Sequence, residues 1–359
     1  MSEPFRILVI NPGSTGTKLA IYRNEEREVL EDVAVESLPG GLVDQLPGHV
    51  AAALAFLAKH GEAPLDAVVG RGGLLRPVPS GTLAVNALML EDARAGFQGE
   101  HVSNLGCLIA DAVASPRGIP AFVVDTVAVD EMPEVAKLTG LPQIRRQALS
   151  HALNLHAAAR KACERVGKKL SDSRWVVAHL GGGFSIVPMV GGKILDSNNA
   201  NSGGPFSPTR AGTLPTQPLM ALCFSGKHQL AELKKMTTRT GGLTAYLGTP
   251  DAREAEARIA AGDAMAKLVY EAMAYQVAKE IGAMAAAIGG SLDGVVVTGG
   301  LAYSDLFCGL VSGKVAFLGP FFRFPGEFEM EALAFGALRV LRGEEKAIAY
   351  PGGNGGGDR

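Results

Sequence analysis

Seven polar side chains stand beside glycines or at the ends of apolar runs, where a side chain can reach a ligand: Asn11, Lys18, Arg71, Asp125, His179, Arg210 and Glu329. The set is rich in cations and has few acids. Phosphoryl transfer through a loose transition state needs cations and hydrogen-bond donors at the equatorial oxygens, and little covalent help from the protein. The set therefore favours phosphoryl transfer.

The same charges leave two classes of acceptor open. A hydroxyl acceptor requires a carboxylate base, and Asp125 is the candidate. A carboxylate acceptor is already ionised at neutral pH and needs no base. It needs cations that offset the repulsion between two anions, and Arg71 and Arg210 fit this second case better.

Other catalytic templates are missing from the sequence. There is no H-E-x-x-H or G-x-S-x-G pattern, and Gly226-Lys227 is followed by His228 rather than by the hydroxyl residue of a P-loop. The four cysteines have no C-x-x-C spacing, which argues against zinc and a disulfide framework and is typical of a reducing cytosol.

Two strand–turn–strand segments must position these side chains. The apolar run 5–10 predicts a buried strand, followed by a Gly/Ser/Thr turn and a second strand over 19–22. A turn of small residues lets backbone N–H groups approach an anion. The pattern recurs over 175–187, with a turn of three glycines. Two such hairpins predict a duplicated fold that holds a nucleotide between its lobes.

The remaining candidates each have a structural alternative. Arg71, flanked by glycines, could approach an anion or be a solvated loop cation, and Arg210 in the irregular loop 196–218 could be a surface cation. Asp125 ends an apolar strand, where it would face a ligand crevice or cap the next turn. His179, taken alone, is more typical of a packed core histidine. Gly299-Gly300 could pass beneath an adenosine or serve only helix packing.

Length and composition set the organisation. A chain of 359 residues with 47% hydrophobic and 19% charged residues is typical of an enzyme with two domains. We expect an N-terminal domain over 1–147, a C-terminal domain over 148–331, a helix over about 332–345 that packs back on the first, and a flexible tail over 346–359. The run 315–320 predicts a strand.

Partners are restricted by charge. A net charge of −2 gives no reason to expect nucleic acid or an anionic membrane. The opening residues do not resemble a signal peptide. The apolar segment 263–288 carries four charges in its interior, so it predicts a core or interface helix and not a membrane span.

Six segments in chain order resemble the butyrate kinase branch of the acetate kinase family. They cover residues 9–15, 69–75, 179–183, 204–210, 298–304 and 325–333. The Asn11-Pro12 pair and the glycines after His179 resemble butyrate kinases more than acetate kinases. The resemblance implies a two-domain duplicated α/β fold, ribonuclease H-like, of the actin-like ATPase class. It implies interconversion of a short-chain carboxylate, with butanoate first, and its acyl phosphate with ATP and Mg²⁺.

The resemblance also implies roles. Arg71 and Arg210 would bind the acid and the transferring phosphoryl group, Asp125 would orient the acceptor or metal, and His179 would donate to the phosphoryl group, with His101 nearby. The nucleotide contacts would come from Asn11, Ser14, Thr15, Lys18, Gly181, Gly182, Gly183, Gly299 and Gly300. Magnesium would use Asn11 and Glu329, with Glu331 as the alternative.

Two departures and three alternatives accompany this interpretation. Gly16 stands where a serine is usual, and the loop 196–204 differs around its asparagines. The acid could be isobutyrate, propionate or acetate. A hydroxyl-acceptor kinase or a non-catalytic ATP-binding module of the same fold would be the rivals. The family further implies a homodimer or higher homo-oligomer assembled through the second domain, by default with two-fold symmetry.

Overall fold

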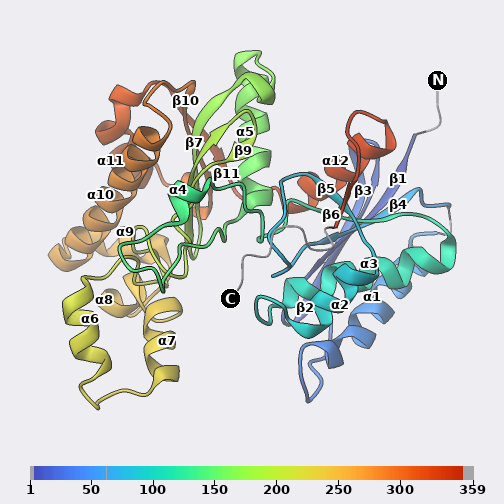
Figure 1. The fold of residues 1–359 in the computed structure, drawn as a ribbon, viewed down its shortest axis with the longest axis horizontal. Coiled ribbons are helices and arrows are strands. Elements are labelled where there is room, and N and C mark those ends of the chain that lie inside the picture. Colours follow the sequence, from blue (N-terminus) through green and yellow to red (C-terminus); the bar gives the residue numbers. More distant parts are fainter. Residues whose placement is uncertain (1–3, 62, 351–359) are drawn as a thin grey trace. The chain divides into compact units, whose positions relative to one another are not determined.

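The computed structural model describes residues 4–61 and 63–350, and these residues form two compact units. Unit 1 comprises the described residues up to Asp130 and from Phe328 onward, and unit 2 runs from Glu131 to Glu327. Each unit is built on one β-sheet with helices packed against it (Figure 1).

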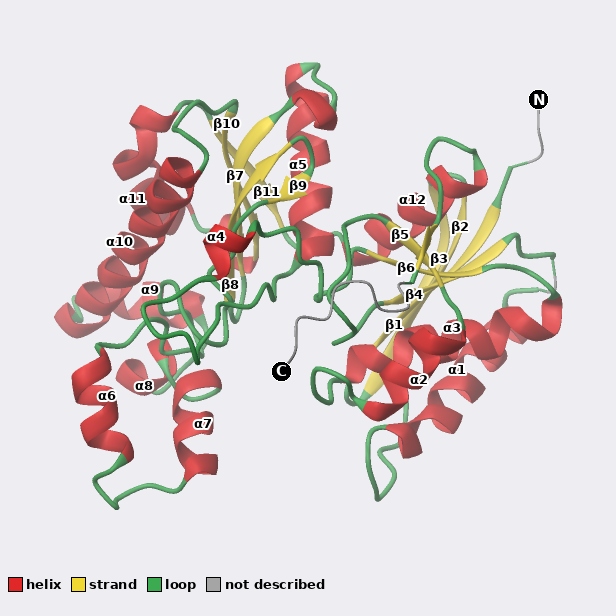
Figure 2. Cartoon of the chain, viewed as in Figure 1, coloured by secondary structure: helices red, strands yellow, loops and turns green. Residues whose placement is uncertain are grey.

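Unit 1 contains a seven-stranded sheet in the order β12-β5-β6-β4-β1-β2-β3. Strands β1, β2 and β3 form an antiparallel meander, and β1, β4 and β6 are parallel. Helix α12 packs on one side of the sheet and α1, α2 and α3 lie on the other (Figure 2). The elements are β1 (Arg6–Pro12), β2 (Gly16–Arg23), β3 (Glu26–Ala34), β4 (Ala67–Arg71), β5 (Thr82–Ala84), β6 (Ala121–Val124), β12 (Ile348–Ala349), α1 (Leu46–Lys59), α2 (Ala87–Ala95), α3 (Leu105–Ala114) and α12 (Glu329–Leu341).

Unit 2 contains a five-stranded sheet in the order β11-β10-β7-β8-β9. Helix α5 packs on one face and α10 on the other, with α9 and α11 against α10 (Figure 1). The elements are β7 (Arg174–Leu180), β8 (Phe184–Val190), β9 (Lys193–Ile194), β10 (Gly294–Gly299), β11 (Phe321–Pro325), α4 (Glu134–Lys137), α5 (Ala152–Val166), α6 (Thr216–Cys223), α7 (Leu230–Thr238), α8 (Gly242–Leu247), α9 (Ala252–Ala260), α10 (Ala264–Ala287) and α11 (Asp305–Val315).

The two sheets share one topology. In unit 1 the order β3-β2-β1-β4-β6 combines an antiparallel meander with two further strands parallel to β1. In unit 2 the order β9-β8-β7-β10-β11 repeats that arrangement around β7. The central strands β1 and β7 are almost wholly buried, as their continuous apolar runs predicted. The predicted duplication is therefore present in the fold.

The units divide earlier in the chain than the boundary predicted at 147/148. Residues 131–150 contain little regular structure and pack with unit 2. The carboxylate of Glu131 accepts a hydrogen bond from the Ile194 amide at 2.9 Å. The guanidinium of Arg146 binds the Asp196 carboxylate at 2.6 and 3.2 Å. The predicted helix 332–345 corresponds to α12, which begins earlier, at Glu329, and belongs to unit 1.

Helix α10 matches the predicted segment 263–288. Asp263 caps it, and its carboxylate accepts hydrogen bonds from the amides of Met265 and Ala266 at 3.0 Å. Tyr270 and Met273 are among the side chains that it buries in the core of unit 2. Within residues 4–61 and 63–350, no helix combines the length and apolar composition that a bilayer crossing requires.

Two local predictions were wrong. The run 315–320 is not a strand: Val315 ends α11, residues 316–318 form a 3-10 turn, and the strand follows at Phe321–Pro325. The predicted flexible tail is ordered at its start, because Ile348–Ala349 pair with β5 and Tyr350 is buried. The remainder of the predicted tail, 351–359, lies outside the described residues.

Candidate active site

In unit 1, three predicted site residues meet where β1 and β4 end and α12 begins. The Asn11 amide donates to Glu329 Oε2 at 2.6 Å, and the Arg71 guanidinium pairs with Glu329 Oε1 at 2.9 Å. Arg71 also donates to Asn11 Oδ1 at 3.4 Å. Asn11 is buried, and the side chain of Glu329 is only 11% exposed. The result is a fixed amide–guanidinium–carboxylate cluster, with its carboxylate in the first turn of a helix, where the macrodipole favours negative charge.

The glycines beside Arg71 have a packing role. A Cβ on Gly70 would lie 2.1 Å from the backbone oxygen of Gly106, and one on Gly72 would lie 2.3 Å from the Thr126 side chain. These glycines let β4 and the following turn pack against α3 and the chain after β6. Arg71 itself reaches the cluster with Glu329, and its approach to an anion stays a prediction.

Asp125 follows the last residue of β6 and is held by the turn before β5. Its Oδ1 accepts a hydrogen bond from the Gly81 amide at 2.7 Å, and its own amide donates to the Gly81 oxygen at 3.0 Å. Its φ of 41° lies in the left-handed region, which costs a non-glycine residue on the order of 1–3 kcal/mol. These two bonds tie Asp125 to the residue directly before β5.

The β1–β2 hairpin exposes the other predicted phosphate contacts. Ser14, Thr15 and Lys18 are exposed, and the Gly13 amide closes the turn on the Gly16 oxygen at 2.7 Å. Lys18 is the register partner of Asn11, so both side chains project from the same face of the sheet. A Cβ on Gly16 would lie 2.8 Å from the Val33 oxygen of β3. In this chain a side chain at position 16 would therefore require β3 to shift.

His101 has a local structural role in unit 1. It is exposed and precedes a 3-10 turn, with its Nδ1 2.7 Å from Ser103 Oγ and 3.2 Å from the Ser103 amide. This arrangement is that of a capping residue.

In unit 2, Arg210 lies against the glycine turn between β7 and β8. A Cβ on Gly183 would stand 2.3 Å from Arg210 Cζ, so the guanidinium rests on glycine backbone. Burial lowers the pKa of Arg210. Among the described residues no carboxylate forms an ion pair with it. A partly buried cation without a protein counterion is a favourable site for an anion.

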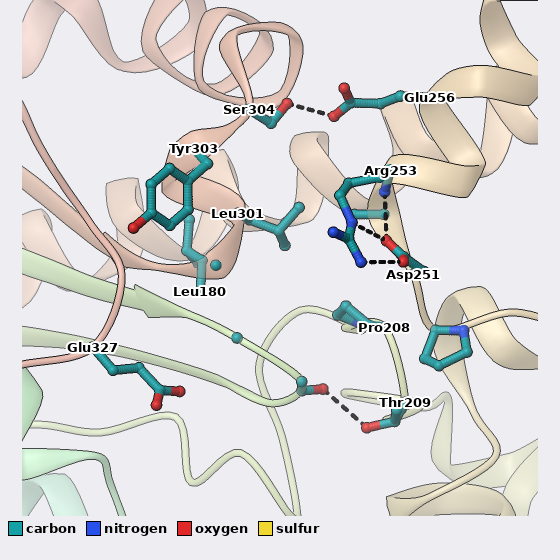
Figure 3. A pocket seen from close by; sticks show the side chains of 15 residues that line it. Leu180, Pro208, Thr209, Asp251, Arg253, Glu256, Leu301, Tyr303, Ser304 and Glu327 are labelled. Atoms are coloured by element: carbon teal, nitrogen blue, oxygen red, sulfur yellow. Dashed lines mark hydrogen bonds and ion pairs between the residues drawn. The ribbon is translucent and has the colours of Figure 1, made fainter. Parts of the chain in front are cut away.

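The loop that carries Arg210 is tied to the same turn. Ser207 Oγ and Thr209 Oγ1 both donate to the Gly182 oxygen, at 2.6 and 2.9 Å, and the second of these bonds is drawn in Figure 3. The Ser207 amide donates to the Arg210 oxygen at 3.0 Å. The turn and the arginine are thus held in one arrangement.

His179 stacks on a second histidine that the sequence analysis missed. The rings of His151 and His179 are parallel to within 27°, with centroids 4.3 Å apart. His179 is buried in β7, and His151 Nδ1 lies 2.8 Å from Ser185 Oγ on β8. The only sequence signal for His151 is its place directly before a long helix.

A cavity of about 700 Å³ opens beside this turn, within unit 2 (Figure 3). Its size is in the range of small-molecule sites. Gly181, Gly182 and Gly300 of the predicted set line it, together with Leu180, Pro208, Thr209, Pro250, Asp251, Ala252, Arg253, Glu256, Leu301, Tyr303, Ser304 and Glu327. Gly299 does not line it but shapes it: its φ is 88°, and a Cβ there would lie 2.6 Å from the Leu180 oxygen.

Asp251 and Glu256, two of the acidic side chains that line this cavity, are held by hydrogen bonds. Hydrogen bonding to the Arg253 side chain lowers the pKa of Asp251 to about 2. Ser304 Oγ donates to Glu256 Oε1 at 2.5 Å, a bond that joins the turn after β10 to α9 (Figure 3). Sequence analysis missed these residues, and the available signal was the Pro250-Asp251 pair, where Asp251 accepts from the Arg253 amide at 2.9 Å and caps α9.

Comparison with known proteins places the chain in a family. Residues 110–320 match the family model described as the Acetokinase family. The protein called probable butyrate kinase 2 from Caldanaerobacter subterraneus subsp. tengcongensis is 49% identical over 352 residues, which cover 96% of this chain and 99% of that protein. The chain belongs to the acetokinase family. It is therefore a phosphotransferase with a carboxyl group as acceptor, and as a kinase it uses ATP.

Solved structures agree on the fold of this acetokinase. The acetate kinase of Porphyromonas gingivalis matches with a TM-score of 0.75 and 21% identity, over 94% of this chain and all of that one. A propionate kinase from Francisella tularensis matches with a TM-score of 0.74 and 21% identity, over 92% of this chain and 98% of that one. The predicted actin-like ATPase fold is confirmed.

Proposed function

We propose that this acetokinase transfers the γ-phosphoryl group of ATP to butanoate, forming butanoyl phosphate and ADP, and also catalyses the reverse reaction. A carboxylate oxygen forms the new bond to phosphorus while the bond to the β,γ-bridging oxygen breaks. The observation that carries the choice of acid is the 49% identity, over nearly the whole chain, with the probable butyrate kinase. Propionate, isobutyrate and acetate are the alternatives, since one methylene in an apolar pocket is worth only about 1–3 kcal/mol.

In unit 2, Arg210 would stabilise the charge on the transferring phosphoryl group. Its partial burial, the glycine backbone beneath it and the absence of an ion-pair partner among the described residues support this role. His179, held by stacking on His151, would donate to the same group. No base is required, because the acceptor is ionised at neutral pH.

The nucleotide would occupy the cavity of unit 2. Gly181, Gly182 and Gly183 would follow the phosphates, and Gly299 and Gly300 would pass beneath the adenosine, with Tyr303 at the wall. The donor set is suitable because glycine backbone can approach a phosphate closely.

In unit 1, Arg71 would bind the acid, Asp125 would orient the acceptor, and Lys18, Ser14 and Thr15 would contact phosphate. Magnesium fits Asn11 and Glu329, since both offer oxygen atoms. No group of three or more His, Cys, Asp or Glu side chains among the described residues could hold a metal by itself. That agrees with Mg²⁺, which commonly uses one or two carboxylates plus substrate phosphates. When bound, the ion would neutralise charge on the phosphate oxygens.

We further propose that the enzyme works in the cytosol as a homodimer or higher oligomer. The four cysteines are free, with only Cys223 exposed, as a reducing compartment allows. Exposed Leu268 and Tyr275 on α10 of unit 2 support association through that helix, because large apolar side chains in the open favour burial against a partner.

Trapping the acyl phosphate tests the proposed reaction. The enzyme is incubated with Mg-ATP, hydroxylamine and acetate, propionate, butanoate or isobutyrate, and acyl hydroxamate is measured. We expect the highest kcat/KM with butanoate, and little product from the Arg210→Ala variant. A higher kcat/KM with another acid would show that this acid, and not butanoate, is the preferred substrate. ADP release with an alcohol and no hydroxamate from any acid would favour a hydroxyl-acceptor kinase.

A further inference from the structure

We propose that the segment Ile348–Tyr350 is a positioning element for Asp125. This segment, called the β12 segment below, holds the short strand β5, and the residue before β5 holds the Asp125 carboxylate. The inference rests on the proposed role of Asp125 at the acceptor. All the contacts involved lie within unit 1.

Tyr350 anchors the β12 segment. It is buried, and its hydroxyl donates to Asp92 Oδ2 at 2.9 Å while accepting from the Arg76 amide at 2.8 Å. Its backbone oxygen accepts from Asn86 Nδ2 at 3.3 Å. Arg76 also pairs with the Asp92 carboxylate at 2.6 Å. The hydroxyl of Tyr350 is therefore part of a satisfied polar network, and losing it would leave buried groups without partners.

The same segment completes the sheet beside β5. Ile348 and Ala349 pair with Leu83 and Ala84 in parallel register. Strand β5 has three residues, and its other neighbour is β6, which ends just before Asp125. Without β12, β5 would be a very short edge strand with one row of backbone groups unpaired.

Ile348 reaches the residue that binds Asp125. A Cβ built on Gly81 would lie 3.0 Å from Ile348 Cδ1, so the isoleucine packs directly on the Gly81 backbone, whose φ is 126°. The amide of Gly81 donates to Asp125 Oδ1, and the Gly81 oxygen accepts from the Asp125 amide. Asp125 has a left-handed φ of 41°, a conformation that persists only where the surroundings enforce it. By packing on Gly81, Ile348 helps to hold Asp125 in this conformation.

A double-mutant cycle tests the inference in the full chain. We expect Ile348→Ala to lower kcat about tenfold, less than the roughly 10²-fold that a 1 Å displacement can cost. In an Asp125→Asn background the same substitution should cause no further loss, because it acts through Asp125. Tyr350→Phe should behave in the same way, and it serves if Ile348→Ala fails to fold. Leu57→Ala, which truncates a buried side chain of α1, should lower the melting temperature and leave kcat unchanged.

The outcomes separate two failures. If Asp125→Asn lowers kcat and Ile348→Ala lowers it by the same factor with or without that change, the β12 segment does not act through Asp125 and the inference is overturned. It is also overturned if folded Ile348→Ala and Tyr350→Phe keep the parental kcat. If Asp125→Asn itself keeps the parental kcat, the proposed role of Asp125 fails, and this inference fails with it.

Discussion

Gly183→Ala should strongly lower the kcat of the enzyme without adding or removing any charge. The new Cβ would stand 2.3 Å from Arg210 Cζ and 2.5 Å from Nε. Carbon atoms in contact prefer about 3.5–4.0 Å, so the guanidinium would have to move by more than about 1 Å. A displacement of that size can cost about 10²-fold in rate, and loss of one transition-state donor costs about 10²–10³-fold, or 2.7–4 kcal/mol.

We therefore expect kcat of Gly183→Ala to fall about 10²-fold, close to the loss in Arg210→Ala. The assay is hydroxamate formation at saturating ATP and acid, with the melting temperature recorded alongside. Gly282→Ala is the matched control, because a Cβ there meets nothing within 4 Å and the residue lies in helix α10. It should retain full activity. A folded Gly183→Ala enzyme with the parental kcat would show that the position of Arg210 does not matter, and would refute the reasoning.

Three further predictions concern unit 1. Glu329→Gln should raise the Mg²⁺ concentration that gives the half-maximal rate about tenfold or more, which is equivalent to about 1.4 kcal/mol of binding free energy. Glu331→Gln should leave that concentration unchanged. The reverse result would assign magnesium binding to Glu331 and not to Glu329. Gly106→Ala should destabilise the protein by about 3 kcal/mol in urea unfolding, because its Cβ would lie 2.0 Å from the Arg71 oxygen; unchanged stability would contradict this packing. Burial lowers the pKa of His49 below the value near 6.5 expected in the unfolded chain, so the free energy of unfolding should fall as pH drops below about 6.5. His49→Gln should flatten this dependence between pH 7.5 and 5.5, and an unchanged slope would assign it to other groups.

The hairpins were readable from the sequence because their signal is local. A continuous apolar run with a glycine turn at its end predicts a buried strand and its return, and both β1–β2 and β7–β8 follow that pattern. The prediction of a strand over 315–320 was wrong for a related reason. A short apolar run fits the end of a helix as well as a strand, and Phe307, Val311 and Val315 recur at helical spacing to bury one face of α11.

The role of a glycine is harder to predict from the sequence than a strand or a turn. Gly183 and Gly72 look alike in sequence, each lying in a glycine turn close to a charged or hydroxylated residue. The first accommodates the guanidinium of Arg210 and the second accommodates the side chain of Thr126. Only the neighbours brought in by the fold distinguish these two uses of a missing Cβ.

By itself the sequence determined the duplicated α/β architecture, the class of chemistry and most charged candidates, because periodicity, turn residues and side-chain charge are properties of short segments. The tertiary structure decided which candidates meet. It joined Asn11, Arg71 and Glu329, residues separated by up to 318 positions, and stacked His179 on His151. It also packed Ile348 against the backbone of Gly81. Such contacts depend on how strands and helices pack, and no local pattern in the chain encodes them.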